Sequence, residues 1–319
     1  MIIDNGVLKD IYSGFKTIFN QGFENTEAQY KKVAMIVPSS SRDEKYKWLG
    51  QMPTLREWIG GREIQHLSAS SYTIENKDWE LTIEVPRNDI KDDNIGIYTP
   101  MVRNIGEEAK IHPDTLVFSL LSKGFSEKCY DGKPFFSSEH QFDRNRAAQS
   151  NCGNKKLSSE SYAAARSCMM SIKGDQERVL KIVPDLLVVP PQLEPEARLI
   201  LFSDQINGTT NIYKGTAELL VVPELADHPT KWYLLATKKS IKPLVFQERE
   251  KPHFVSKTLD TDDNVFFHNT YLYGAEARYN AGYGLWQLAY GSTGEDEKTV
   301  QDEEGKKTVD KVAESEGKE

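Results

Sequence analysis

The sequence predicts an α+β fold with a helix-rich middle and a strand-rich end. Apolar residues recur at helical spacing in two long stretches, near residues 4–19 and 88–123. Apolar and polar residues alternate over residues 79–85, which is typical of a strand with one buried face. Short apolar segments separated by turn residues fill the second half of the chain. Because helices and strands are segregated along the chain, the pattern indicates the α+β class.

The first predicted helix has an apolar stripe along one side. Its members are Val7, Ile11, Phe15, Ile18 and Phe19. Either Asp4 or Asn5 is suited to the N-cap position, since both side chains accept hydrogen bonds from free backbone amides. We therefore expect an amphipathic helix of about four turns, followed by an extended arm.

The stretch from residue 39 to 77 is rich in tryptophan, glycine and charge. It predicts two short extended segments with Gly60 and Gly61 at the tip. A lone two-stranded hairpin is marginally stable in water, so Trp48 and Trp58 need to be covered. Either the core of the same chain or a neighbouring molecule could cover them.

A strand over residues 79–85 and a long helix come next. Pro86 ends the strand, and Asn88 and Asp89 cap a helix over about residues 88–123. Pro113 is expected to kink this helix. Its roughly eight to nine turns are well beyond the average of about three.

The second half of the chain combines two helices with several strands. The helices are expected at about 158–172, capped by Ser158 or Ser159, and at 195–202. The strands are expected at 186–189, 217–222, 232–236, 265–268, 271–279 and 285–291. Residues 280–284 predict a hairpin loop between the last two strands.

Composition excludes several classes of protein. The chain has 319 residues with 38% hydrophobic residues, enough for a folded core. It has no apolar stretch of the 18 or more residues that a membrane helix needs and no secretory signal, so a cytoplasmic site of synthesis is expected. The net charge of −8 disfavours tight binding to DNA. Residues 292–319 predict a disordered acidic tail, because they lack aromatic residues, leucine and isoleucine.

No catalytic or cofactor-binding motif is found. Phosphate-binding, dinucleotide-binding, serine-hydrolase and zinc-protease signatures are all missing. Cys129, Asp131 and His140 are the nearest approach to a nucleophile, an orienting acid and a base. A buried structural cysteine is the simpler interpretation.

A metal site is not predicted either. Cys129, His140, Cys152 and Cys168 are soft ligands, but they lack the close pairs that are typical of zinc sites. Asp92 with Asp93, and the group Asp260, Asp262 and Asp263, are better explained as helix-start and loop charges. We therefore expect no catalytic residue, no cofactor and no metal.

Several motifs occur in the order found in one known family. They are Lys47-Trp48-Leu49-Gly50, Leu55-Arg56-Glu57-Trp58, Gly61-Arg62, Tyr72-Thr73-Ile74, the run 87–93 with Gly96-Ile97-Tyr98, Cys129-Tyr130-Asp131-Gly132 with Phe135-Phe136 and His140, and Tyr273-Gly274-Ala275-Glu276-Ala277-Arg278. Together they resemble the Mu-like phage major head subunit (gpT) family. The likeness runs from about residue 20 to residue 292, and the motifs between residues 48 and 93 are the most specific.

The resemblance implies the Hong Kong 97-type capsid fold and its parts. These would be an N-terminal arm (1–37), a projecting E-loop hairpin (38–78), a peripheral domain (79–172 and 243–291) with a spine helix at about 88–123, an axial domain (173–242) and the acidic tail (292–319). The long helix, hairpin and amphipathic arm expected from the residues alone fall in the same order.

The resemblance also implies a function, that of the major capsid protein of a Mu-like tailed phage or prophage. Copies would form hexamers and pentamers of an icosahedral shell around double-stranded DNA, assembled in the bacterial host cytoplasm. Expected partners are a portal protein, a separate scaffold or protease and a decoration protein, with weak DNA contact and no membrane. We expect Phe15, Phe19, Trp48, Leu49 and Trp58 to be contacts between subunits. The alternatives are a soluble enzyme that uses Cys129 and His140, or a scaffold or tail protein.

Overall fold

The computed structural model describes residues 4–49, 72–141, 147–174 and 178–295. Backbone contacts divide the chain into two compact units. The first consists of residues 1–45, 73–117 and 244–282, and the second of residues 46–72, 118–243 and 283–319. Residues 118–172, which the resemblance assigned to the peripheral domain, make most of their contacts within the second unit.

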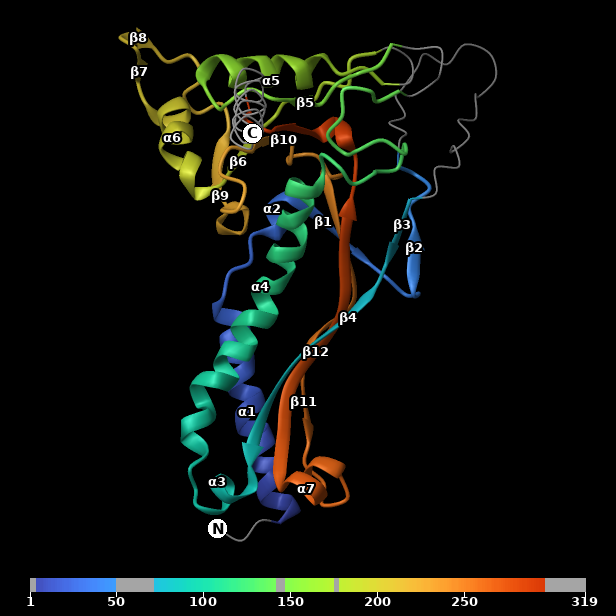
Figure 1. Ribbon diagram of the computed structural model, residues 1–319, viewed down its shortest axis with the longest axis vertical. Helices are drawn as coiled ribbons and strands as arrows, with labels where there is room; N and C mark the ends of the chain where they lie inside the picture. Colours follow the sequence, from blue (N-terminus) through green and yellow to red (C-terminus); the bar gives the residue numbers. More distant parts are fainter. Residues whose placement is uncertain (1–3, 50–71, 142–146, 175–177, 296–319) are drawn as a thin grey trace, which may run out of the picture. The chain divides into compact units, whose positions relative to one another are not determined.

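A four-stranded sheet forms one layer of the first unit (Figure 1). In spatial order its strands are β1 (Ala34–Pro38), β11 (Leu244–Lys257), β12 (Thr270–Tyr283) and β4 (Lys77–Pro86). Strand β1 runs parallel to β11, whereas β4 is antiparallel to β12, with Trp79 opposite Ala277. The predicted alternating strand is therefore confirmed as β4, at an edge of the sheet.

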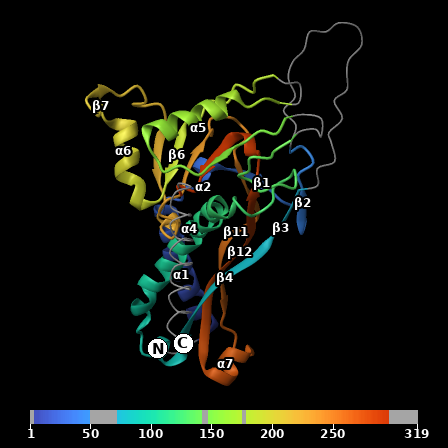
Figure 2. The same ribbon diagram turned by 45° about the horizontal axis from the view of Figure 1, so that its top comes forward.

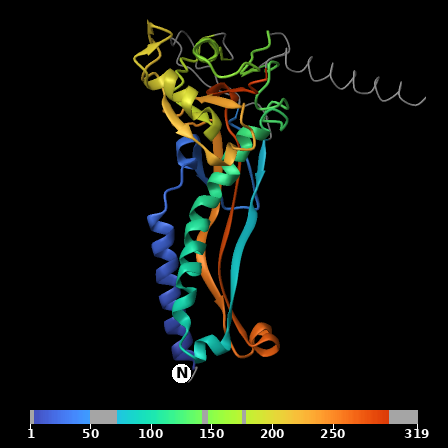
Figure 3. The same cartoon turned by 60° about the vertical axis from the view of Figure 1, so that its left-hand side comes forward.

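Helices α1 (Asn5–Asn25) and α4 (Thr99–Lys123) cover the same face of this sheet (Figures 1 and 3). The Asp4 carboxylate accepts hydrogen bonds from the amides of Gly6 and Val7, which confirms the predicted N-cap. At 21 residues α1 is longer than expected. Its apolar stripe forms one core with residues of β12 and α4, including Tyr273 and Ile105.

Two glycines let α1 and α4 approach each other closely. A Cβ atom at Gly106 would lie 2.2 Å from the carbonyl oxygen of Phe19. A Cβ atom at Gly22 would lie 2.3 Å from the carbonyl oxygen of Arg103. Since no side chain fits in such a space, each glycine provides the room that the other helix's backbone needs.

The predicted spine helix is broken near its start. Helix α3 (Arg87–Lys91) ends before Asp93, whose φ of 60° is left-handed and cannot continue a right-handed helix. A 3₁₀ turn (Ile95–Tyr98) leads into α4, which runs on through Pro113. A single helix from residue 88 was therefore wrong, while the long helix and its internal proline are confirmed.

The segment after α1 is fixed to α4 by a buried carboxylate. The Asp114 side chain accepts hydrogen bonds from the backbone amides of Gln29, at 2.9 Å, and Tyr30, at 2.6 Å. These amides begin the short helix α2 (Tyr30–Val33), which leads directly into β1. A buried polar group that finds partners in this way holds the segment in one position.

The base of the predicted projecting loop is a small hairpin. Strand β2 (Asp43–Lys45) pairs antiparallel with β3 (Thr73–Glu75). The two short extended segments are thus confirmed at the base. Gly60 and Gly61, expected at the tip, lie outside the described residues.

The second unit is built on a five-stranded sheet (Figures 1 and 2). In spatial order its strands are β5 (Cys152–Gly153), β13 (Ala289–Ser292), β10 (Trp232–Leu235), β6 (Leu186–Val189) and β9 (Glu218–Val221). Every residue of β6 is buried, as predicted for a central strand. Helix α5 (Ser159–Ser171) contacts β13, and helix α6 (Glu194–Phe202) contacts β9 and β6.

Smaller elements complete this unit. They are the hairpin β7 (Gln205–Ile206) and β8 (Thr209–Thr210), and 3₁₀ turns at Pro191–Leu193, Pro223–Leu225 and Trp286–Leu288. Ser158 caps α5 in a reciprocal capping box with Ser161, which confirms the predicted helix start.

Three expectations near the C-terminal end were wrong, and one strand was missed. Residues predicted as a strand at 265–268 form helix α7 (Asp263–His268). Residues 280–283 continue β12 rather than turning, and β13 joins a different sheet. The 14-residue strand β11 was not anticipated. Ser292, assigned to the tail, belongs to β13, and the amide of Thr293 donates to the carbonyl of Gly153.

The glycine contact between α1 and α4 can be tested with one substitution made at two sites. Gly106→Ala should destabilise the chain by about 1–3 kcal/mol, because the new methyl group overlaps the backbone of Phe19. Gly14→Ala is the matched control, because Gly14 lies at an exposed position of the same helix pair, on α1, and no atom lies within 4 Å of the new Cβ. It should stabilise by about 0.5–1 kcal/mol. Urea denaturation measures both effects, and two effects of the same sign would contradict the close contact.

Candidate inter-subunit surfaces

The structure places Phe15 and Phe19 inside the chain's own core. They are 3% and 2% exposed. Phe15 makes an edge contact with Tyr273, with ring centroids 5.0 Å apart, and Phe19 lies 5.5 Å from Phe254. In this conformation neither ring has area to offer a neighbour, because the stripe of α1 covers the sheet of the same unit. The expectation that these two residues contact other subunits is therefore corrected.

The residues expected in the projecting loop divide into three cases. Leu49 is 0% exposed, so its side chain is also already buried within the chain. Trp48 is half-buried, with its ring edge-on to Tyr46 at 6.2 Å. Trp58 lies outside the described residues. Of the three, only Trp48 has a described side chain with surface still open to a partner.

An exposed aromatic pair that the sequence did not reveal lies between β11 and β12. Phe266 and Phe267 of α7 are 75% and 70% exposed, and their rings meet edge to face at 5.0 Å. Val265 beside them is buried. Because these residues were predicted to form a strand, an exposed pair on a helix was not expected. The available signals were Asp262 before the helix and Asn269 after it.

The position of α7 is fixed by hydrogen bonds from an asparagine side chain rather than by burial of its phenylalanines. Asn264 Nδ2 donates to the carbonyl of Lys257, at 3.1 Å, and to the carbonyl of Thr270, at 2.7 Å, so this side chain joins the end of β11 to the start of β12. Asn269, at a φ of 56°, ends the helix in the left-handed conformation that asparagine tolerates. Phe266 and Phe267 are thus held outward by a defined local structure.

Further exposed apolar side chains lie at the same end of the first unit, where Figure 1 shows α3 and α7. Ile97, Met101 and Leu259 are each at least half exposed. Arg87 of α3 is 3.4 Å from the carboxylate of Asp260, which joins the two regions. We name Leu259, Phe266, Phe267, Ile97 and Met101 the apolar end. A group of large exposed apolar residues of this kind is typical of a protein interaction site.

The residues considered for catalysis form a closed hydrogen-bonded cluster in the second unit. The Asp131 carboxylate lies between the other two, 3.2 Å from Cys129 Sγ and 2.6 Å from His140 Nδ1. His140 is 0% exposed and stacks on Trp286 at a centroid distance of 4.0 Å. The Cys129 thiol donates its hydrogen bond to Asp131 and not to the imidazole, so His140 is not placed to take the thiol proton.

The charges in this cluster suit a structural role. Burial, followed by the neighbouring Asp131 carboxylate, raises the pKa of the Cys129 thiol, which therefore stays protonated at neutral pH. Burial alone would raise the pKa of the Asp131 carboxyl group. The hydrogen bond from His140 and the other donors outweigh burial, so the pKa of Asp131 is lowered. A nucleophilic cysteine requires the opposite shift.

Among the described residues, only Cys129, Asp131 and His140 bring three metal-ligating side chains close together. Among the described residues, neither Asp92 with Asp93 nor the group Asp260, Asp262 and Asp263 forms such a cluster. No helix in the described ranges has the length and apolar character needed to cross a bilayer.

The combination of these two units is that of a Hong Kong 97-type capsid subunit. The chain is similar to a subunit of the procapsid of bacteriophage JBD30, with 32% identity and a TM-score of 0.60. The match covers 94% of this chain and 79% of that one. The capsid of a native GTA particle shares the fold at 9% identity, with a TM-score of 0.51, over 84% of this chain and 91% of that chain.

Sequence comparison places the chain more narrowly. The family described as the Mu-like prophage major head subunit gpT matches residues 8–156, 149–225 and 224–319, so the chain belongs to this family. It is 33% identical to the major capsid protein of Escherichia phage Mu, over 92% of this chain and 76% of the relative. It is 30% identical to the Mu-like prophage FluMu major head subunit of Haemophilus influenzae, over 90% of this chain and 73% of the relative. The chain is a structural capsid subunit and not an enzyme.

The two kinds of phenylalanine should respond differently to truncation. Phe15→Ala should lower the free energy of unfolding by about 3–5 kcal/mol, because it leaves a cavity in the core. Phe267→Ala should change it by no more than about 0.5 kcal/mol, because the ring is exposed. Urea denaturation of the unassembled chain measures both. Similar losses for the two variants would show that Phe267 is packed internally.

The buried thiol should resist alkylation. Cys129 should react with iodoacetamide at pH 8 at least tenfold more slowly than an exposed thiol, because burial keeps it protonated and covered. Mass spectrometry of the folded chain, with the unfolded chain as reference, gives the rate at each cysteine. Rapid labelling of Cys129 before Cys152 and Cys168, which are partly exposed, would contradict its placement.

Proposed function

We propose that copies of this chain assemble into hexamers and pentamers of an icosahedral shell that encloses double-stranded DNA, and that the apolar end contacts neighbouring copies. The observation that carries this proposal is the exposure of Phe266 and Phe267 on a locally fixed helix. Adjacent exposed phenylalanines are unfavourable in water, and a shell provides each copy with neighbours to cover them.

Trp48 and Trp58 remain part of this proposal as contacts of the projecting loop. Trp48 retains open surface, and aromatic side chains supply large contact areas with few torsions to restrict. Contacts around a ring of copies are heterologous, so each patch meets a different patch on the next subunit. Several contacts of about 800 Å² per partner would together stabilise a shell whose individual contacts are modest.

Other partners follow from this assembly. We propose a portal protein, a separate scaffold or protease, and a decoration protein, and a decorated capsid is known for the fold relative from bacteriophage JBD30. The net charge of −8 supports only weak, non-specific contact with packaged DNA. Assembly would take place in the cytoplasm of the bacterial host.

The proposal is tested by the assembly state of the expressed full chain. Sedimentation and electron microscopy should find rings, sheets or shells. Phe266→Ser combined with Phe267→Ser should reduce the assembled fraction at least fivefold, since it removes apolar contact area, and leave the unfolding of single subunits unchanged.

The matched control keeps the apolar character of the same two positions. Phe266→Leu combined with Phe267→Leu should assemble more efficiently than the serine pair. A wild-type chain that remains a single compact particle at all concentrations would refute the assembly proposal. A serine pair that assembles like wild type would refute the role of the apolar end alone.

A further inference from the structure

The cluster of Cys129, Asp131 and His140 brings a sulfur, an oxygen and a nitrogen atom together in the second unit. One such atom from each residue lies within 4.8 Å of the other two. Along the chain, Asp131 follows Cys129 by two positions and His140 follows Asp131 by nine, so no zinc motif is visible in the sequence. Thiolate, imidazole and carboxylate are nevertheless the protein ligands that zinc takes, and the fold places one of each at a single point.

The backbone holds all three residues in place. Gly132 has a φ of 80°, which allows a tight turn, and its amide donates to the carbonyl of Cys129 at 3.0 Å. Asp131 lies within this turn. His140 exchanges two backbone hydrogen bonds with Gln149, at 3.1 and 2.8 Å. The three side chains are therefore positioned by local structure, as a preorganised metal site requires.

The second ring nitrogen of His140 is paired as it is in known zinc sites. Nε2 lies 3.2 Å from Asn151 Oδ1 and 3.3 Å from the carbonyl oxygen of Phe135. The Asn151 amide is fixed in orientation, because Oδ1 accepts from the amide of Ser137 and Nδ2 donates to the carbonyl of Phe135, each at 2.8 Å. Both neighbours of Nε2 are thus acceptors, so Nε2 carries a hydrogen. A histidine that binds zinc donates its other N–H to a carbonyl or carboxylate in the same way.

A divalent cation can enter this cluster without changing its total charge. The Cys129 thiol donates to one oxygen of Asp131, at 3.2 Å, and a proton is shared between the other oxygen and His140 Nδ1, at 2.6 Å. With these two protons the three side chains carry no net charge. A dication that replaces both protons leaves a thiolate, a carboxylate and a neutral imidazole around two positive charges, and the total is again zero. The large cost of burying an uncompensated charge is therefore avoided.

We propose that Cys129, Asp131 and His140 bind a zinc ion, which releases two protons to solvent as it enters. Zinc bonds are about 2.0–2.3 Å long, so small side-chain rotations bring ligand atoms within 4.8 Å of one another onto one ion. Sulfur and imidazole ligands favour zinc over magnesium or calcium. The Asp131 side chain is 13% exposed, so water on that side would supply the fourth ligand. The bound ion would join the turn after α4 to the segment paired with Gln149. This inference does not depend on the proposed assembly.

Zinc binding by the full chain tests the site. After treatment with a chelator and dialysis against zinc, we expect one tightly bound zinc per chain by elemental analysis. Calorimetric titration in buffers of different ionisation enthalpy should find about two protons released per zinc. X-ray absorption of the loaded chain should show one sulfur at about 2.3 Å and nitrogen or oxygen neighbours at about 2.0–2.2 Å.

Serine substitutions identify which sulfur binds the ion. Cys129→Ser keeps a donor for Asp131 but removes the sulfur ligand, and it should weaken zinc binding at least a hundredfold. Cys152→Ser combined with Cys168→Ser is the matched control, because it leaves Cys129 as the only cysteine of the chain. This control should bind zinc within twofold of wild type and keep the sulfur neighbour. Zinc should raise the thermal midpoint of wild type and control, and not that of Cys129→Ser.

Three results would overturn the proposal. They are a wild-type chain that binds no zinc, a control variant whose bound zinc has no sulfur neighbour, and a Cys129→Ser variant that binds zinc as wild type does. If Cys129→Ser does not fold, the sulfur neighbour in the control variant decides the question, since only Cys129 can supply a thiolate there. None of these results bears on whether copies of the chain assemble.

Discussion

The close packing of α1 on α4 through Gly22 and Gly106 determines which parts of the first unit are complete and which stay open. Helix α1 packs beside α4 at this short distance, and its Phe15 and Phe19 are buried in one core with residues of β12. The sheet extends beyond this contact to the edge strand β4, where the space beneath α4 is lined by alanine. The sheet face that the two helices cover is therefore closed around Phe15 and Phe19 and open beside Ala109.

Buried polar groups have a parallel role in holding segments of each unit. Asp114 fixes the start of α2 in the first unit, and Asp131 links Cys129 with His140 in the second. In both cases a carboxylate receives several donors, which offsets its loss of hydration. Cys129 and His140, which look catalytic in the sequence, are thus buried hydrogen-bond partners of Asp131.

Sequence patterns predicted the elements that local physics determines. The N-cap Asp4, the alternating strand β4 and the buried strand β6 all have clear periodic or capping signals. Strand β11 was missed because residues 247–251 are almost continuously charged or polar, and its buried face comes from packing with β12. Likewise, Phe266 and Phe267 have high strand propensity, but the local hydrogen bonds of Asn264 and the left-handed Asn269 place them in a short helix with their rings exposed.

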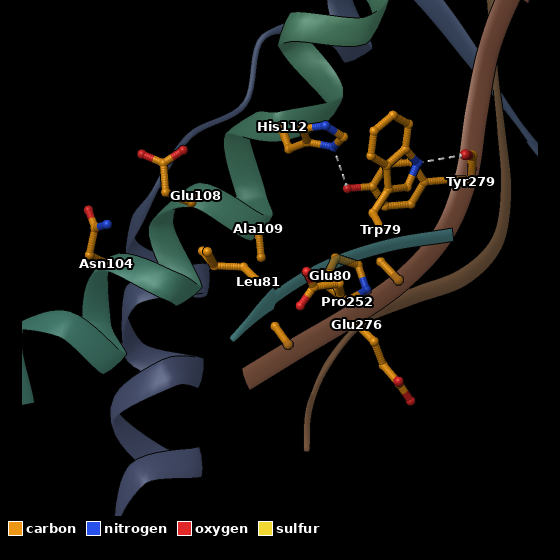
Figure 4. Close-up of a pocket in the computed structure, with 12 residues that line it drawn as sticks. Trp79, Glu80, Leu81, Asn104, Glu108, Ala109, His112, Pro252, Glu276 and Tyr279 are labelled. Carbon is orange, nitrogen blue, oxygen red and sulfur yellow. Dashed lines mark hydrogen bonds between the residues drawn. The ribbon is translucent and has the colours of Figure 1, made fainter. Parts of the chain in front are cut away.

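The candidate surfaces were harder to predict than the fold. Apolar stripes in a sequence do not say whether the partner is the same chain or another, so Phe15, Phe19 and Leu49 were assigned outward when the chain buries them itself. A cavity of about 410 Å³ that is lined by Trp79, Ala109 and Tyr279 (Figure 4) had no sequence signal, because its members come from four elements spread over about 200 positions. Only the fold brings them together.

The Tyr12 hydroxyl donates to the carbonyl of Phe254, 242 positions later, at 2.9 Å. Helix α1 is made first by the ribosome, yet the strands that cover its phenylalanines are made last. During synthesis the apolar face of α1 therefore stays without its native partner until most of the chain has been made. Contacts between residues so far apart in the sequence slow folding and leave apolar surface exposed in the meantime. Newly made subunits should therefore depend on chaperones more than their size suggests.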